Sequence, residues 1–104
     1  MTTPIDCQGE IAIRAFEPGD EAGVLACHNR VFASGAHATA PRTPQLWRWK
    51  FLENPAQRVQ QMLAVHRDQG VVGVYASLPV AITLGGRRTF ATQAVDHCVR
   101  PEWL

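Results

Sequence analysis

The chain has 104 residues, of which 46% are hydrophobic and 18% are charged, and its formal net charge is +1. This length allows one small domain, and the composition is that of a folded globular chain rather than a disordered one. The near-neutral charge argues against a nucleic-acid or membrane-surface role, and no apolar run approaches the roughly 20 residues of a membrane-spanning helix.

The first residues and the cysteines predict a cytoplasmic protein. Residues 1–6 contain neither the basic region nor the apolar region of a secretory signal. The three cysteines, Cys7, Cys27 and Cys98, are odd in number and widely spaced, which is typical of free thiols in a reducing compartment.

The first half of the chain predicts a leader, one strand and two helices. Residues 1–10 show no periodicity and are expected to be a flexible leader. Residues 11–16 alternate apolar with small or polar side chains, which predicts a strand. An apolar stripe with spacings of three and four predicts a helix over about residues 20–33. A second helix, rich in aromatic residues, is expected between Pro44 and Asn54, because proline suits the first helical position.

The second half predicts three strands joined by short turns. Residues 61–66 form the first strand, and a tight turn at Gly70 leads into a strand over residues 71–84. Pro79 removes one hydrogen-bond donor from that strand, so a bulge or a sheet edge is expected there. A glycine-containing turn leads into the last strand, residues 89–99. The order strand, helix, helix and three strands predicts an α+β fold with a mostly antiparallel sheet.

Several short segments are informative through their common order and spacing. The first starts with an Ile-Arg pair and contains a Pro-Gly-Asp turn, and the third is rich in tryptophan. The segments are residues 13–21, 29–32, 47–55, 73–80, 93–96 and 99–102. Together they resemble the N-terminal half of the GNAT-type N-acetyltransferases. The resemblance implies that residues 11–104 form a truncated GNAT-like domain.

The resemblance also implies an activity and a cofactor, because members of this family transfer an acetyl group from acetyl-CoA to an amine. In relatives, backbone groups at the end of the fourth strand pair with the pantetheine arm of the cofactor. The matching positions here are His97, Cys98 and Val99. We therefore expect these three residues to contact acetyl-CoA through their backbone, whereas the alternative is that they only end a strand.

The resemblance is less specific about the site that binds the acceptor amine. In relatives the first two helices border the acceptor site, which implies Trp47 and Trp49 as substrate-binding residues, although packing onto the sheet is an alternative for at least one of them. Asp96 is the third candidate for this site. Asp96 and Glu53 are also the acids that could act as water-linked bases, and a solvated or capping role is the alternative for both. No catalytic residue is identified.

One part of the family pattern is missing from these residues. In the family, a basic, glycine-rich loop and a helix follow the fourth strand, and their N–H groups hold the cofactor pyrophosphate. No glycine follows Gly86 in this sequence. We therefore expect an enzyme that is inactive unless another chain complements it. The alternatives are a non-catalytic remnant or small interaction module, and a small ligand-binding fold with Trp47 and Trp49 lining its pocket.

Three further expectations concern metals, thiol chemistry and assembly. The histidines and cysteines lack the spacing of a zinc site, so no metal is expected. On a strand, Asp96 and Cys98 face one side and His97 the other, so adjacency does not pair His97 with Cys98, and a core role is favoured for the thiol. The last strand would have an unpaired outer edge, which predicts a homo-oligomer through that edge.

Overall fold

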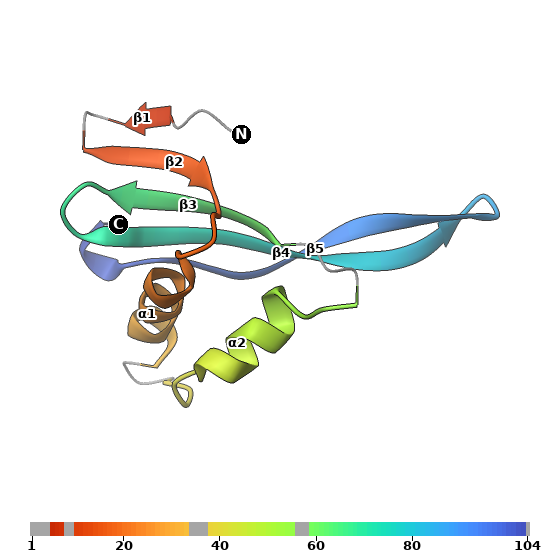
Figure 1. Cartoon of the computed structure of the whole chain (residues 1–104), viewed down its shortest axis with the longest axis horizontal. Coiled ribbons are helices and arrows are strands. Elements are labelled where there is room, and N and C mark those ends of the chain that lie inside the picture. The colour runs from red at the N-terminus through yellow and green to blue at the C-terminus, as the bar shows by residue number, and fades with distance from the viewer. Residues whose placement is uncertain (1–4, 8–9, 34–37, 56–58, 104) are drawn as a thin grey trace.

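The computed structural model describes residues 5–7, 10–33, 38–55 and 59–103. The described elements, in chain order, are β1 (Ile5–Cys7), β2 (Ile11–Ala15), α1 (Glu21–Phe32), α2 (Pro44–Phe51), β3 (Gln60–His66), β4 (Gly70–Leu84), β5 (Arg87–Val99) and the 3-10 turn η1 (Pro101–Trp103). The strands form one sheet in the order β1-β2-β3-β4-β5, and every neighbouring pair is antiparallel (Figure 1).

The α+β class and the order of the two helices and the last four strands are as predicted. The additional strand, β1, departs from the flexible leader expected over residues 1–10, because it pairs with β2 from Ile5 opposite Ile13 to Cys7 opposite Ile11. A strand of three residues is too short to show a periodicity, so the local pattern does not predict it.

The turn from β2 into α1 is held by an ion pair. The guanidinium of Arg14 donates to both carboxylate oxygens of Asp20, at 2.6 and 2.8 Å, and the N–H of Glu17 donates to the same carboxylate. Asp20 occupies the N-cap position of the helix, although its side chain bonds Arg14 rather than the helix N–H groups. The hydrogen bond from Arg14 holds the pKa of Asp20 below its ordinary value.

The start and end of α2 follow the predicted signals. The Thr43 hydroxyl accepts a hydrogen bond from the N–H of Leu46, and Pro44 takes the first helical position. The helix ends at Phe51, three residues before Asn54. Neither helix in the described ranges is long and apolar enough to cross a membrane.

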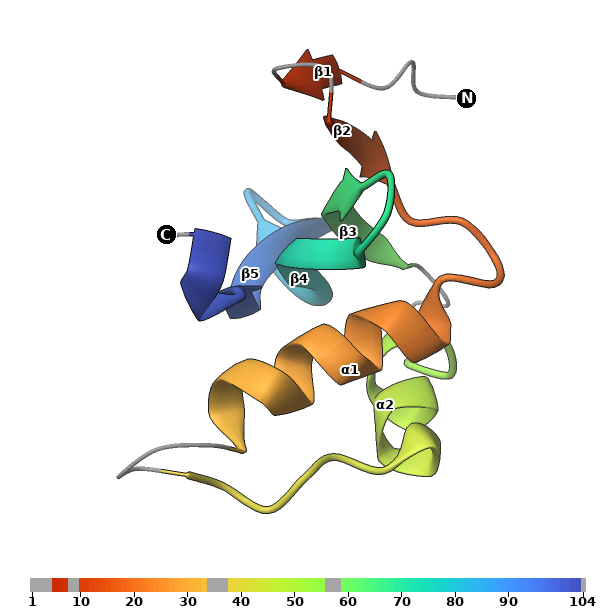
Figure 2. The ribbon, with the colours of Figure 1, turned by 90° about the vertical axis from the view of Figure 1, so that its left-hand side faces the viewer.

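Both helices pack on the same face of the sheet, which Figure 2 shows from the side. Their inward side chains meet those of β3, β4 and β5 in one core. The buried apolar residues of this core are Val24, Cys27, Trp47, Phe51, Leu63, Val71, Val74, Ala76 and Cys98. The opposite face of the sheet, here called the open face, carries no helix in the described part of the chain.

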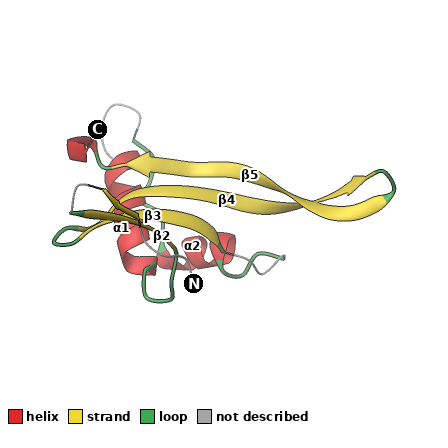
Figure 3. Ribbon diagram, turned by 90° about the horizontal axis from the view of Figure 1, so that it is seen from above, coloured by secondary structure: helices red, strands yellow, loops and turns green. Residues whose placement is uncertain are grey.

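The last part of β4 and the first part of β5 project beyond the other strands as a two-stranded arm (Figures 1 and 3). β3 pairs with β4 only as far as Ser77, so the following residues of β4 pair with β5 alone. Pro79 lies in this stretch, which confirms the expected sheet edge there; no bulge occurs at Pro79, since it pairs in regular register with Thr92. Gly85 and Gly86 both have positive φ, as the tight hairpin turn requires.

Candidate functional site

A β-bulge interrupts β5 close to its end. Tyr75 of β4 lies opposite two residues of β5, Asp96 and His97, so one residue of β5 is extra. Asp96 has a φ of 53° and is the one non-glycine residue with positive φ in the described part of the chain. A short polar side chain tolerates this left-handed conformation better than a branched or bulky one. Bulges of this kind redirect side chains and are frequent beside functional sites.

Around the bulge, successive side chains point to opposite faces of the sheet. The carboxylate of Asp96 and the thiol of Cys98 lie on the helix side. His97 lies on the open face, where its ring stacks on Tyr75 with the centroids 4.0 Å apart. The expectation that His97 and Cys98 face opposite ways is therefore confirmed, and the two do not form a thiol–imidazole pair.

On the helix side, Asp96 is the centre of a cluster of charged side chains, here called the Asp96 cluster. Its Oδ2 accepts hydrogen bonds from Arg42 Nη1 at 2.8 Å and from Lys50 Nζ at 2.7 Å. Its Oδ1 lies 3.9 Å from Nε2 of His28. Asn29 holds the backbone of Arg42 in place through its side-chain amide. The bulge is thus tied to α1, to α2 and to the segment between them.

The charges of this cluster oppose a role of Asp96 as a base. Burial raises the pKa of Asp96, but the hydrogen bonds from Arg42 and Lys50 outweigh burial and leave the pKa below its ordinary value. Burial, assisted by the charge of Arg42, lowers the pKa of His28, so His28 is neutral near pH 7. A carboxylate that already binds two cations is a poor proton acceptor, and Asp96 is better suited to holding the bulge in shape.

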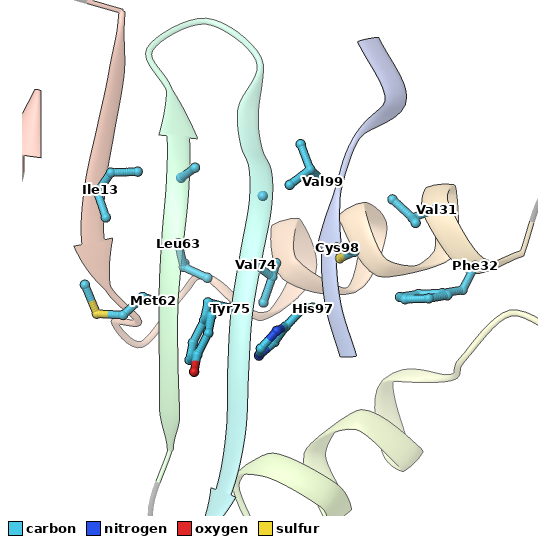
Figure 4. A pocket seen from close by; sticks show the side chains of 12 residues that line it. Ile13, Val31, Phe32, Met62, Leu63, Val74, Tyr75, His97, Cys98 and Val99 are labelled. Carbon is cyan, nitrogen blue, oxygen red and sulfur yellow. The ribbon is translucent and has the colours of Figure 1, made fainter. Parts of the chain in front are cut away.

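A shallow hollow of about 570 Å³, here called the open-face pocket, is lined by open-face side chains of β3, β4 and β5 and also by residues of α1 and of the core (Figure 4). Met62, Tyr75 and His97 lie next to one another across β3, β4 and β5. The lining residues are Ile13, Val31, Phe32, Met62, Leu63, Ala64, Gly73, Val74, Tyr75, His97, Cys98 and Val99. All three residues expected to contact a cofactor therefore border this one hollow, whose walls are mostly apolar.

His97 is held in one orientation within the pocket. Its Nε2 lies 3.0 Å from the carbonyl oxygen of Ala76. Because a carbonyl can only accept, Nε2 donates this hydrogen bond, which leaves Nδ1 as the ring nitrogen that can accept a proton. The imidazole therefore presents a proton-accepting nitrogen from a fixed position at the bulge.

The two tryptophans expected near an acceptor do not lie together. Trp47 is buried with 1% of its surface exposed, whereas Trp49 is 65% exposed on the other side of α2. Trp47 borders an inner cavity of about 10 Å³ together with Asp96 and Gln61, but Trp49 does not. Trp47 therefore packs onto the sheet, which was the alternative for at least one of the two tryptophans. Glu53 is exposed and lies beside Arg48.

The sequence alone does not reveal Tyr75, Arg42 or Lys50 as neighbours of the bulge. Tyr75 alternates with buried Val74 and Ala76, so period-two patterning could have placed it on the open face. Arg42 and Lys50 lie 54 and 46 residues from Asp96, and no local pattern carries such pairings.

The described residues contain no group of three or more His, Cys, Asp or Glu side chains that could hold a metal ion.

The comparisons with known proteins leave the family open. No family model matches the chain, and searches of curated proteins and of solved structures find no significant match.

Proposed function

We propose that this chain forms the N-terminal layer of a GNAT-type acetyltransferase and that it binds acetyl-CoA along the outer edge of β5. The observation that carries the proposal is the combination, at one place, of a sheet edge, a bulge and an apolar hollow. β5 is the last strand of the sheet, so its outer edge has no strand partner in the described ranges. The bulge at Asp96 and His97 lies where this edge meets the open-face pocket.

Physical chemistry supports the pantetheine arm as the ligand of this edge. The arm is extended and carries two amide groups, so it can pair with backbone N–H and C=O groups as an added strand would. His97, Cys98 and Val99 supply these backbone groups, and the apolar walls of the pocket suit the methylene groups of the arm. A backbone N–H that the bulge frees from the ladder is a suitable donor to the thioester carbonyl.

His97 is the proposed general base for the acceptor amine. An amine attacks a thioester only after losing a proton, and imidazole is suited to accept one near neutral pH. His97 lines the open-face pocket, and its Nδ1 would supply the required lone pair while Nε2 stays bonded to Ala76. Asp96 is a positioning residue in this proposal, because Arg42 and Lys50 fix its carboxylate. Trp49 is exposed on α2, which packs on the face of the sheet opposite His97, so it does not belong to the acceptor site proposed here.

The first test measures binding of the pantetheine arm through changes in the backbone amide resonances of the protein. Titration with acetyl-CoA, and separately with pantetheine, should shift the amide signals of residues 97–99 in a saturable manner. Adenosine 3′,5′-bisphosphate, which lacks the arm, should not shift them. His97→Ala keeps the backbone contacts but removes one wall of the pocket, so it is expected to weaken pantetheine binding about tenfold, which corresponds to about 1.4 kcal/mol.

A matched control is Thr92→Ala, which changes another exposed residue of β5 away from the pocket. This variant should bind pantetheine like the unchanged protein. Absence of saturable shifts at residues 97–99, or equal losses of affinity in both variants, would contradict the proposal.

The two-stranded arm formed by β4 and β5 favours a second candidate function, a small interaction module that binds another copy of the chain. Along β4, one side of the arm carries Val80, Ile82 and Leu84, which are 39%, 37% and 69% exposed. A two-stranded hairpin is marginal by itself in water, and an exposed apolar stripe beside an unpaired edge favours association. The expected homo-oligomer through the β5 edge would cover both features.

Sedimentation equilibrium tests this association with a pair of neighbouring substitutions. Ile82→Lys places a charge on the apolar side of the arm, whereas Thr83→Lys places the same charge on its opposite side. We expect a dimer whose dissociation constant rises tenfold or more in Ile82→Lys, from loss of about 1.4 kcal/mol or more of apolar contact. Thr83→Lys should change it little. A monomer at all concentrations, or equal effects, would exclude association through the apolar side of the arm.

A further inference from the structure

Two thiols from distant parts of the chain meet in the core. Cys27 of α1 and Cys98 of β5 are 71 residues apart in sequence, yet their Sγ atoms lie 3.9 Å apart. Both are free thiols and both are buried, with 1% and 6% of their surfaces exposed. A disulfide requires a separation of about 2.05 Å, so the sulfur atoms must approach by about 2 Å. Side-chain rotation supplies a movement of this size when the two backbones are already packed together.

Each of the two cysteines lines a hollow. Cys27 lines a hollow of about 380 Å³ together with Arg30 and Arg100. Cys98 lines the open-face pocket. A small oxidant therefore needs to cross only the wall of a hollow to reach either sulfur, whereas a large reagent would require the core to open.

The surroundings of the pair favour a thiolate at Cys27 over one at Cys98. The hydrogen bond with Cys98 lowers the pKa of Cys27 and the charge of Arg100 lowers it further, although burial opposes them. The same interaction and burial raise the pKa of Cys98. The thiolate is the nucleophilic form of cysteine. Cys27 also shares its hollow with Arg30 and Arg100, whose charges favour a thiolate there, so we assign Cys27 as the attacking residue and Cys98 as the residue that resolves the product.

We propose that Cys27 and Cys98 form a redox-active pair that hydroperoxides oxidise to an intrachain disulfide joining α1 to β5. This inference does not depend on the proposed acetyl transfer. It assigns a modification site to two thiols that otherwise serve only as part of the core.

The oxidation proceeds in two balanced steps. The Cys27 thiolate attacks an oxygen of the hydroperoxide, an S–O bond forms, the O–O bond breaks, and the alkoxide takes a proton to leave as an alcohol, or as water from hydrogen peroxide. Cys98 then loses its proton and attacks the sulfenic sulfur, an S–S bond forms, the S–O bond breaks, and hydroxide leaves as water. The two thiols lose two electrons in total, and the peroxide gains them.

The disulfide would act directly on the bulge. Cys98 is two residues beyond Asp96, and Cys27 precedes His28, which belongs to the Asp96 cluster. Oxidation would therefore fasten both the strand end and the helix that border the bulge. We expect slower hydrogen exchange of the amides of residues 97–99 in the oxidised protein.

Peptide mapping tests the pair without any substitution. Trypsin leaves Cys7, Cys27 and Cys98 on three separate peptides, namely residues 1–14, 15–30 and 89–104, because Pro101 protects the bond after Arg100. The folded protein is treated with hydrogen peroxide, denatured, alkylated with iodoacetamide and digested. The expected product joins the peptides of Cys27 and Cys98, disappears on reduction, and leaves Cys7 alkylated.

Several results would overturn the proposal. These are alkylation of both Cys27 and Cys98 after peroxide treatment, conversion of Cys27 to a sulfinic acid without a cross-link, and a cross-link that involves Cys7. A fourth is formation of the same cross-link equally fast in denaturant, because the folded geometry would then have no role.

Two variants separate the roles of the thiols. Cys98→Ser should halt the reaction at the sulfenic acid of Cys27, which dimedone labels on the peptide of residues 15–30. Cys7→Ser is the matched control and should leave the cross-link unchanged. Dimedone on Cys7 alone in the first variant would contradict the assignment of Cys27 as the attacking thiol. Should Cys98→Ser fail to fold, the map of the unchanged protein still decides.

Discussion

Replacing Trp47 with alanine is expected to lower the free energy of unfolding by about 3–5 kcal/mol. The ring of Trp47 is 1% exposed and packs against Phe16 and Phe51, with ring centroids 5.8 and 5.5 Å away. Its removal leaves a cavity between α2 and the sheet that neighbouring side chains fill only in part. Since a small domain has roughly 5–15 kcal/mol of stability in total, this loss is a large fraction of it. Urea unfolding followed by circular dichroism measures the change.

Trp49→Ala is the control for this prediction. Trp49 is the same residue type on the same helix, but it is 65% exposed. Its removal should change the free energy of unfolding by no more than about 0.5 kcal/mol. Equal losses in the two variants would mean that Trp47 does not anchor α2 as the burial indicates.

Replacing Asp96 with asparagine is expected to lower the free energy of unfolding at pH 7 by about 2 kcal/mol, between the values of surface and fully buried ion pairs. The substitution leaves Arg42 and Lys50, whose side chains are 15% and 23% exposed, without their carboxylate partner. Asparagine keeps the shape of the side chain and tolerates positive φ, so backbone strain does not contribute. Urea unfolding at a series of pH values measures the difference.

The loss of stability in Asp96→Asn should depend on pH. The folded protein holds the pKa of Asp96 below its ordinary 3.8, so the contribution of the carboxylate is present above that pH and is lost as the pH falls through the folded pKa. Below that range Asp96 is protonated in both states. The difference in stability between the two proteins should therefore shrink toward zero in strong acid, and a constant difference would contradict the ion-pair origin.

His28 should cause a separate decrease in the stability of the folded protein at milder pH. Its pKa in the folded protein lies below the ordinary 6.5 because of burial, so the unfolded chain takes up a proton first as the pH falls. Stability therefore decreases from about pH 6.5 downward. This decline should be present in both the unchanged protein and the Asp96→Asn variant.

Much of the fold could be predicted because its signals are local. The apolar stripe of α1, the Thr43 and Pro44 start of α2 and the alternation of the strands depend on neighbours within a few residues. The same reasoning predicts that Asp96 and His97 face opposite sides of β5. β1 is too short to carry such a pattern, and the bulge in β5 has no glycine to mark it.

The candidate site was less predictable because its residues meet through tertiary packing and not through a local pattern. Trp47 and Trp49 lie two residues apart on one helix, so the pattern indicates that they face different ways. Which of them is buried depends on how α2 lies on the sheet. The position of Trp47 between Phe16 and Phe51 comes from that docking.

By itself, the amino-acid sequence determined the α+β class, the order of the main elements and the opposite faces taken by His97 and its two neighbours. These properties follow from the periods of helix and strand and from the backbone preferences of proline and glycine. Only the tertiary structure decided that Lys50 would reach Asp96 across 46 residues and that Cys27 would meet Cys98 across 71. Such contacts depend on how helices pack against a sheet, because the atoms that meet share no local backbone geometry.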